Sequence, residues 1–269
     1  MAVTSKPTTS FSDMVMQRWK LTIEYDGAPF YGWQRQGSLP SVQQTIETAI
    51  RDFSQQDITI HAAGRTDTGV HAKGQIAHFD LDYGDRGITP FEMAKAINAH
   101  MKPYLVSILK AEIVAPDFHA RFQAKNKLYT YRLLSRQGAP TYERGKVWHT
   151  HHKLDSAAMH KAAQHLVGHH DFTSFRDSAC QAKSPVKTLT RLDVEEKIYD
   201  DHGGREILIH AEGRSFLHHQ VRNMVGTLYL VGDGKWQPDD VRAALDAKDR
   251  AKAGPTCPPD GLYLVRIDY

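Results

Sequence analysis

The chain has 269 residues, of which 41% are hydrophobic and 24% are charged, as in an ordinary globular protein. It contains no run of eighteen apolar residues, so the sequence predicts no membrane span and no membrane partner. Residues 1–17 are rich in Ser and Thr and lack an apolar core, so we expect a disordered tail rather than a secretory signal. The two cysteines, Cys180 and Cys257, form no Cys-x-x-Cys pair, which favours a reducing cytoplasm and no disulfide framework.

The net charge of +3 is too small to indicate a nucleic-acid partner, but its distribution is uneven. Residues 121–153 carry eight basic side chains and one acid, Glu143, which gives this segment a charge of +7 and leaves −4 for the rest. Aromatic residues are interleaved with these charges: Phe122, Tyr129, Tyr131, Tyr142 and Trp148. Cations for phosphates and flat rings for bases are the combination that RNA binding requires. The alternative is a solvated strand face whose rings pack into the core, which we expect for Tyr131.

Strands and helices alternate through the first half of the chain. Every second residue from Trp19 to Tyr25 is apolar, which predicts a half-buried strand. Ser41 and Gln44 resemble a capping box, and an apolar stripe from Val42 to Phe53 predicts the helix that follows. The other elements expected in this half are strands over residues 57–62, 75–79 and 105–114 and a helix over residues 89–100.

The pattern restarts near residues 115–117. The elements expected beyond this point are strands over residues 128–134, 186–196 and 205–212 and a helix over residues 155–167. We expect Ser215 to cap a further helix, in which His218 and Arg222, like His219 and Asn223, share the side opposite much of the apolar stripe. The sequence therefore predicts an α+β fold of two similar halves, residues 18–115 and 116–269.

Residues 64–72 (GRTDTGVHA) form the segment best suited to chemistry. They place Asp67 between two glycines, with Arg65 two residues before it and His71 four after it. Glycines let a loop bring its backbone close to a ligand, and an acid displayed on such a loop is a candidate nucleophile or base. The alternative is a turn in which Asp67 accepts backbone hydrogen bonds and pairs with Arg65 at the surface.

The sixteen histidines include three adjacent pairs, but none has the His-Glu-x-x-His spacing or a neighbouring cysteine. We therefore expect no metal site. The chain also lacks a Gly-x-Gly-x-x-Gly segment that opens a helix and a phosphate-binding Gly-Lys-Ser/Thr loop, so we expect no cofactor.

Ordered sequence blocks resemble the tRNA pseudouridine synthase A family. They are YDG at 25–27 with YGWQRQ at 31–36, GRTDTGVHA at 64–72, DFHARF at 117–122 and YTY at 129–131, HHDFTSFR at 169–176, FLHHQVRNMVG at 216–226, and GLYL at 261–264. A lone Gly-Arg-Thr-Asp would be weak, whereas six blocks in family order from residue 19 onward are specific. Thr68 departs from the family's commoner alanine, and the N-terminal tail has no counterpart.

The resemblance implies isomerisation of uridine to pseudouridine at positions 38–40 of the tRNA anticodon stem-loop, without a cofactor. Asp67 would be the catalytic nucleophile, Arg65 would help to position it and hold the flipped nucleotide, and Arg222 would pair with Asp67. Tyr129 would lie against the target uracil and Leu262 would form an apolar wall. Further RNA contacts are expected at Arg35, His71, Arg121, Arg176, His218 and His219, although a structural role is an equal alternative for the histidines. The resemblance also implies a homodimer, in which two α+β halves with mainly antiparallel sheets join across a central RNA-binding cleft.

This chemistry suits a solitary carboxylate. The bond from C1′ to uracil N1 must break, the base must turn, and C5 must join C1′. Asp67 can begin this at C1′, at C6, or by removing the C2′ proton, and the sequence does not choose among these routes. A neighbouring arginine favours the charged form of a carboxylate, so no histidine is needed to activate it. Three alternatives stay open: a glycosidase or nucleoside hydrolase, a non-catalytic RNA-binding module, and a synthase that acts on another RNA or tRNA position.

Overall fold

The computed structural model describes residues 16–84 and 87–269. Its strands are β1 (Gln17–Tyr25), β2 (His61–Ala62), β3 (His71–Leu81), β4 (Val106–Val114), β5 (Asn126–Ser135), β6 (Trp148–Thr150), β7 (Gly168–Asp171), β8 (Val186–Ile198), β9 (Arg205–Gly213) and β10 (Leu262–Asp268). Its helices are α1 (Val42–Ser54), α2 (Pro90–His100), α3 (Ser156–Ala163), α4 (Gln220–Gly232) and α5 (Pro238–Ala247). The tail expected over residues 1–17 lies outside the described residues up to residue 15, and Gln17 already belongs to β1.

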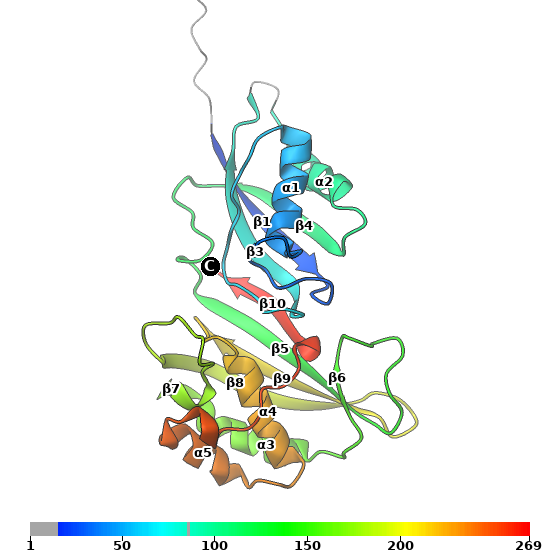
Figure 1. Ribbon diagram of the computed structural model, residues 1–269, viewed down its shortest axis with the longest axis vertical. Coiled ribbons are helices and arrows are strands. Elements are labelled where there is room, and N and C mark those ends of the chain that lie inside the picture. Colours follow the sequence, from blue (N-terminus) through cyan, green and yellow to red (C-terminus); the bar gives the residue numbers. More distant parts are fainter. Residues whose placement is uncertain (1–15, 85–86) are drawn as a thin grey trace, which may run out of the picture.

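One continuous sheet runs the length of the molecule, as Figure 1 shows. The strand order is β4-β1-β3-β10-β5-β9-β8-β7, with β2 paired to β3 and β6 paired to β5. Most neighbours are antiparallel, whereas β10 runs parallel to β3. The expected α+β fold with mainly antiparallel pairing is confirmed, and β10 is the strand that joins the sheets of the two halves.

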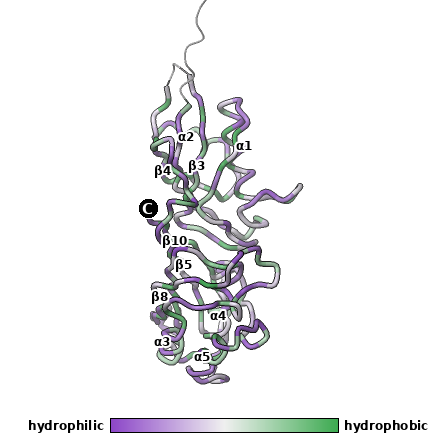
Figure 2. Tube along the Cα trace, turned by 90° about the vertical axis from the view of Figure 1, so that its left-hand side faces the viewer, coloured by the Kyte–Doolittle hydropathy of each residue, from purple (hydrophilic) through white to green (hydrophobic). Residues whose placement is uncertain are grey.

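The helices bury the apolar side of this sheet. Figures 1 and 2 show that α1 and α4 lie on the same side of the strands, one over each half. Trp19, Leu21 and Ile23 are fully buried at alternate positions of β1, as their spacing predicts. The Ser41 hydroxyl accepts a hydrogen bond from the backbone of Gln44 and caps α1. These local signals agree with the tertiary packing, so the first half follows its sequence pattern closely.

The start of α4 differs from the expectation. The helix begins at Gln220 and not after Ser215, because His219 takes a left-handed conformation with φ of +59°. The side chain of Gln220 accepts from the backbone N–H of Leu217 and closes this turn. Asn223 is fully buried and donates to the carbonyl of Phe175, so it shares no exposed face with His219. The two histidines therefore lie in the turn that precedes the helix.

Two other expected elements are shorter in the structure, and several observed elements were not expected. The strand expected over residues 57–62 shortens to His61–Ala62, because of these residues only His61 and Ala62 pair with β3; the loop that carries Asp67 follows them. The helix expected over residues 155–167 ends at Ala163 and continues as a 3-10 turn. The sequence pattern did not predict α5, β6, β7 or β10.

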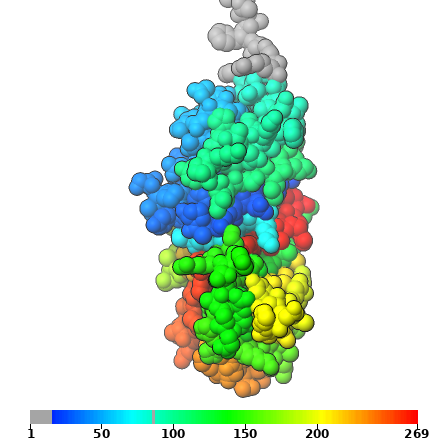
Figure 3. Space-filling view, turned by 90° about the vertical axis from the view of Figure 1, so that its right-hand side faces the viewer, coloured from blue at the N-terminus to red at the C-terminus, as the bar shows by residue number. Residues whose placement is uncertain are grey.

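The connection between β5 and β6 packs beside the hairpin turn between β8 and β9. Figure 3 shows the green segment of residues 136–147 next to the yellow turn. Arg136 forms an ion pair of 3.0 Å with Asp200 in that turn. Arg136 of the basic segment is thus paired with an acid of the protein itself.

No helix among the described residues is long and apolar enough to cross a membrane.

Candidate active site around Asp67

The loop between β2 and β3 presents Asp67 on a fixed backbone. The carbonyl of Thr66 accepts from the backbone N–H of Trp33 at 3.1 Å, and the Thr66 hydroxyl lies 2.7 Å from the hydroxyl of Tyr25. The Asp67 carbonyl accepts from the N–H of Val70 at 3.1 Å, which closes a turn. The N–H of Gly69 donates to the carbonyl of Phe30 at 3.3 Å, so the segment that follows β1 holds the loop on both sides of Asp67.

Gly69 connects this loop to the segment that leads into β10. Its φ is +78°, a conformation that favours glycine. A Cβ at this position would lie 2.9 Å from Cγ of Pro259. The glycine two residues after Asp67 is thus required by both its conformation and its packing.

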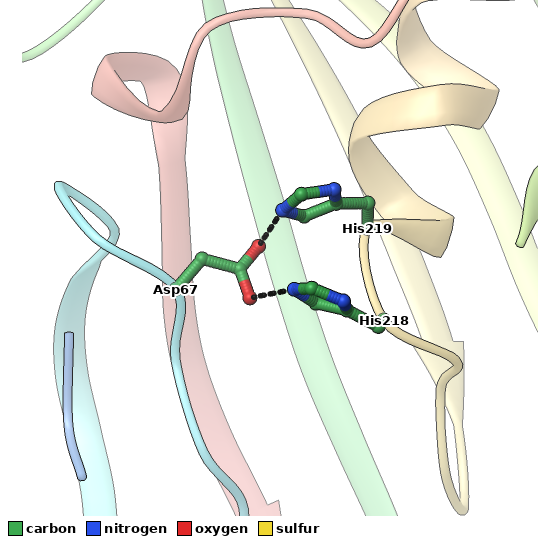
Figure 4. A group of neighbouring side chains, drawn as sticks. All are labelled: Asp67, His218 and His219. Atoms are coloured by element: carbon green, nitrogen blue, oxygen red, sulfur yellow. Dashed lines mark ion pairs between the residues drawn. The ribbon is translucent and has the colours of Figure 1, made fainter. Parts of the chain in front are cut away.

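Three basic side chains from the second half surround the Asp67 carboxylate. Nη1 of Arg222 lies 3.4 Å from Oδ2, Nε2 of His219 lies 3.4 Å from Oδ2, and Nε2 of His218 lies 3.5 Å from Oδ1. Figure 4 shows both imidazoles directed at the carboxylate from the turn before α4. The Asp67 side chain keeps 24% of its surface exposed, so the group is held and also accessible.

Arg222 is the fixed member of this group. Its Nε donates to the carbonyl of Cys257 at 2.8 Å, while Nη1 donates to Asp67. Only 13% of its side chain is exposed. A guanidinium can make both bonds at once, so Arg222 ties the carboxylate of Asp67 to the segment that carries Cys257.

A second carboxylate, Asp177, lies behind the histidines. Its Oδ2 is 2.7 Å from Nδ1 of His219, and its Oδ1 is 3.6 Å from Nδ1 of His218. The backbone N–H of Asp177 also donates to the carbonyl of His218. Asp177 was not among the expected site residues, although it directly follows the block that ends at Arg176. Asp177 orients the two imidazoles and does not approach Asp67 as an acid–base partner.

Tyr129 on β5 is buried near Asp67, and Leu262 is buried on the adjacent strand β10. Tyr129 is 9% exposed and packs edge-on against Phe216, with ring centroids 5.2 Å apart. Burial raises the pKa of its hydroxyl above the ordinary range, and nearby Tyr25 and Asp67 add to this effect. Leu262 is buried as the first residue of β10. Tyr131 is fully buried, as expected.

The other candidates lie apart from the Asp67 carboxylate. Arg65 is exposed, and its side chain makes no hydrogen bond or ion pair within residues 16–84 and 87–269, whereas Arg222 contacts Asp67 as expected. Arg35 pairs with Glu47. Arg176 donates to the carbonyls of Cys180 and Ala182. Arg121 is exposed and lies over the Phe122 ring.

His71 has a structural environment. It is 2% exposed, its Nδ1 accepts from the backbone N–H of Gly27 at 3.0 Å, and its ring stacks on Tyr263. Burial lowers the pKa of His71, against the raising effect of Asp26. These contacts join the loop to the first strand and leave His71 away from the accessible side of Asp67.

Lys127 is a second residue whose contact with the Asp67 loop was not expected from the sequence. Its buried Nζ donates to the carbonyl of Ala63 at 2.8 Å, at the start of the Asp67 loop. Burial, aided by Arg121, lowers the pKa of Lys127 to about 8. Lys127 lies one residue before the strand expected over residues 128–134, and its contact with the loop depends on the fold.

The fold and the site together define a class of protein: an α+β protein in which one loop carboxylate from the first half meets an arginine and a buried tyrosine from the second. The family described as tRNA pseudouridine synthase matches residues 21–123 and 162–269. Proteins named tRNA pseudouridine synthase A are 55% identical in Rhodospirillum centenum, 54% in Cereibacter sphaeroides and 51% in Bradyrhizobium diazoefficiens. Each alignment covers 94% of this chain and 98–100% of the relative. The chain belongs to the tRNA pseudouridine synthase family.

Proposed function

We propose that this family member isomerises uridine to pseudouridine at positions 38–40 of the tRNA anticodon stem-loop, with Asp67 as its nucleophile. The observation that carries the proposal is the accessible Asp67 carboxylate, 3.4 Å from the fixed guanidinium of Arg222 and beside buried Tyr129. Residues 18–115 supply the carboxylate and residues 116–269 supply the arginine and tyrosine, so we propose this division as the functional one. The cytoplasm, where tRNA is available, is the compartment that we propose.

The carboxylate begins the reaction by attack at C1′ or C6, or by removal of the C2′ proton. The glycosidic bond then breaks and its electron pair goes to the departing uracil. After the base has turned, C5 bonds to C1′ and Asp67 is released, by loss of its bond to C1′ or C6 or by return of the C2′ proton; the proton on C5 is lost and N1 gains a proton. The buried faces of Tyr129 and Leu262 support retention of the free base, because a dry pocket keeps water from C1′.

The target nucleotide must leave the RNA stack before it reaches Asp67. Such flipping costs a few kcal/mol, which phosphate contacts from basic side chains offset. Arg121 lies exposed on the segment that leads into β5, and Arg65 lies exposed two residues before the nucleophile. We propose that Arg65 and Arg121 contact the RNA, whereas Arg222 contacts Asp67. We also propose a homodimer, which the family resemblance implies and light scattering will test.

The test is an unmodified tRNA transcript that carries labelled uridine, incubated with the protein and mapped by position. We expect labelled pseudouridine at one or more of positions 38–40. Product at another position would contradict the assigned substrate, and free labelled uracil would indicate a hydrolase instead.

A further inference from the structure

The carboxylate of Asp67 and the imidazoles of His218 and His219 lie close together, and each imidazole faces one oxygen of the carboxylate. One ligand atom from each lies within 4.8 Å of the others, and Figure 4 shows both Nε2 atoms facing the carboxylate. Spacing along the chain gave no sign of this group, because Asp67 and the histidines are about 150 residues apart. Two imidazoles and a carboxylate are a ligand set that divalent zinc takes in proteins.

The distances suit a tetrahedral ion. Zinc bonds to nitrogen and carboxylate oxygen are about 2.0–2.2 Å long, so two ligands of one tetrahedron stand about 3.3–3.6 Å apart. The separation is 3.5 Å between His218 Nε2 and Oδ1 and 3.4 Å between His219 Nε2 and Oδ2. Both fall in this range, each for a different oxygen of the carboxylate, so an ion at this place would lie within reach of both oxygens. These separations exceed a normal hydrogen bond, so the three groups stand far enough apart to admit an ion.

The surroundings orient the imidazoles for coordination. Asp177 lies 2.7 Å from Nδ1 of His219 and 3.6 Å from Nδ1 of His218. A ring whose Nδ1–H donates to a carboxylate presents its Nε2 lone pair on the opposite side, which is the usual arrangement around metal-bound histidine. His218 is 39% exposed and Asp67 is 24% exposed, so an ion can enter from solvent.

We propose that Asp67, His218 and His219 bind one divalent zinc-like ion, and that the bound ion blocks the reaction by occupying the carboxylate. The binding is independent of the proposed function, whereas the inhibition rests on it. Arg222 opposes the ion, because its Nη1 lies 3.4 Å from Oδ2 of Asp67. The charges that face the site are thus the carboxylates of Asp67 and Asp177 against the guanidinium of Arg222. The site is inhibitory and not a cofactor site, since the ion and the flipped uridine compete for the same oxygen atoms.

The direct test titrates the full-length protein with Co²⁺, whose tetrahedral complexes absorb strongly in the visible range, and then with Zn²⁺ in competition. We expect one metal equivalent in the wild-type protein and none in the double variant His218→Gln, His219→Gln. Asp177→Asn should weaken binding by about 10–100-fold. His151→Gln, which alters an exposed adjacent pair elsewhere, is the matched control and should leave this equivalent unchanged. Arg222→Gln should tighten binding severalfold, a gain that a misfolded variant would not give.

The same absorption band in the double variant would overturn the proposal, because it would place the metal on other histidines. Unchanged or weaker binding in Arg222→Gln would also contradict the assigned site. The inhibition is tested with Zn²⁺ alone on tRNA turnover, where excess tRNA should relieve it and displace the Co²⁺ band. Metal bound at this site without inhibition would overturn the blocking of Asp67. Absence of turnover in metal-free protein would count against the proposed function and leave the binding result standing.

Discussion

His78 lies in a cluster of imidazoles on β3, away from Asp67. Its ring stacks on His61 and meets His119 edge-on, and its Nδ1 accepts from the backbone N–H of Ala120 at 3.2 Å. Burial lowers the pKa of His78 to about 4, and the charges of His119, His61 and Arg18 add to this against the opposite effect of Asp80. A neutral His78 is therefore part of the folded structure at neutral pH.

This neutral histidine makes stability depend on pH. The unfolded chain protonates His78 near pH 6.5 and the folded chain near pH 4, so the folded state loses stability as the pH falls through this window, by on the order of 2–3 kcal/mol. His78→Asn keeps an acceptor for Ala120 and has no such titration. Urea unfolding at pH 7.5 and 4.5 should show a smaller loss of unfolding free energy in the variant. An equal loss in both proteins would contradict this account.

At the same scale, the sequence predicted part of the candidate site. The resemblance indicated both Asp67 and Arg222, and the structure brings them into contact. The resemblance also implied that Arg65 helps to position Asp67, but the Arg65 side chain is exposed. His218 and His219 were placed on a helix face, whereas the left-handed conformation of His219 turns both rings toward Asp67. Such a backbone choice depends on tertiary contacts and leaves no periodic signal.

The Asp67 loop is the element whose geometry matters most. Gly69 takes a positive φ and lies against Pro259. Gly203 also takes a positive φ, of +87°, but no atom lies within 4 Å of the position that a Cβ would occupy there. The two glycines thus separate the cost of the conformation from the cost of the contact.

Gly203→Ala should lower the free energy of unfolding by about 1–2 kcal/mol, and Gly69→Ala should lower it by more, because its methyl group also meets Pro259. Only Gly69→Ala should lose activity, by about 100-fold, because the added methyl group must displace the loop that carries Asp67. Unfolding curves and the rate of tRNA modification measure both effects. Equal activity in the two variants would mean that this contact does not position the nucleophile.

Among the elements, those with a clear period were predictable and the others were not. The alternation of β1 and the caps of α1 and α2 identify these elements correctly. β10 was missed because its first three residues are buried in succession between β3 and β5, which removes the alternation. The strand that joins the two halves is therefore the one with the weakest local signal.

At the scale of the whole molecule, the basic segment is less available than its sequence indicates. Arg132 pairs with Glu143 and Glu206, Arg136 pairs with Asp200, Lys146 pairs with Asp26, and Lys127 is buried. Four basic residues of residues 121–153 are exposed and form no ion pair with the described parts of the chain: Arg121, Lys125, Arg144 and Lys153. The sequence predicted the cations correctly, but their partners follow from the tertiary structure.

The dependence of tRNA affinity on salt follows from these free cations. Arg121→Gln and Lys125→Gln should each reduce the slope of log affinity against log salt by about 1. Arg136→Gln is the matched control and should leave the slope unchanged, because Arg136 already pairs with Asp200. Filter binding between 50 and 200 mM KCl measures the three slopes. A reduction in Arg136→Gln alone would show that the internal pairs open on RNA.

The most direct test of the account is Asp67→Asn, assayed by release of label from C5 of uridine in tRNA. We expect tRNA binding to stay within a few-fold of wild type, because the exposed cations are untouched, while label release stops. The asparagine keeps the shape of the side chain and removes the nucleophilic charge, so a structural role of Asp67 would leave turnover largely intact. Turnover retained by Asp67→Asn would contradict the assignment of Asp67 as the nucleophile.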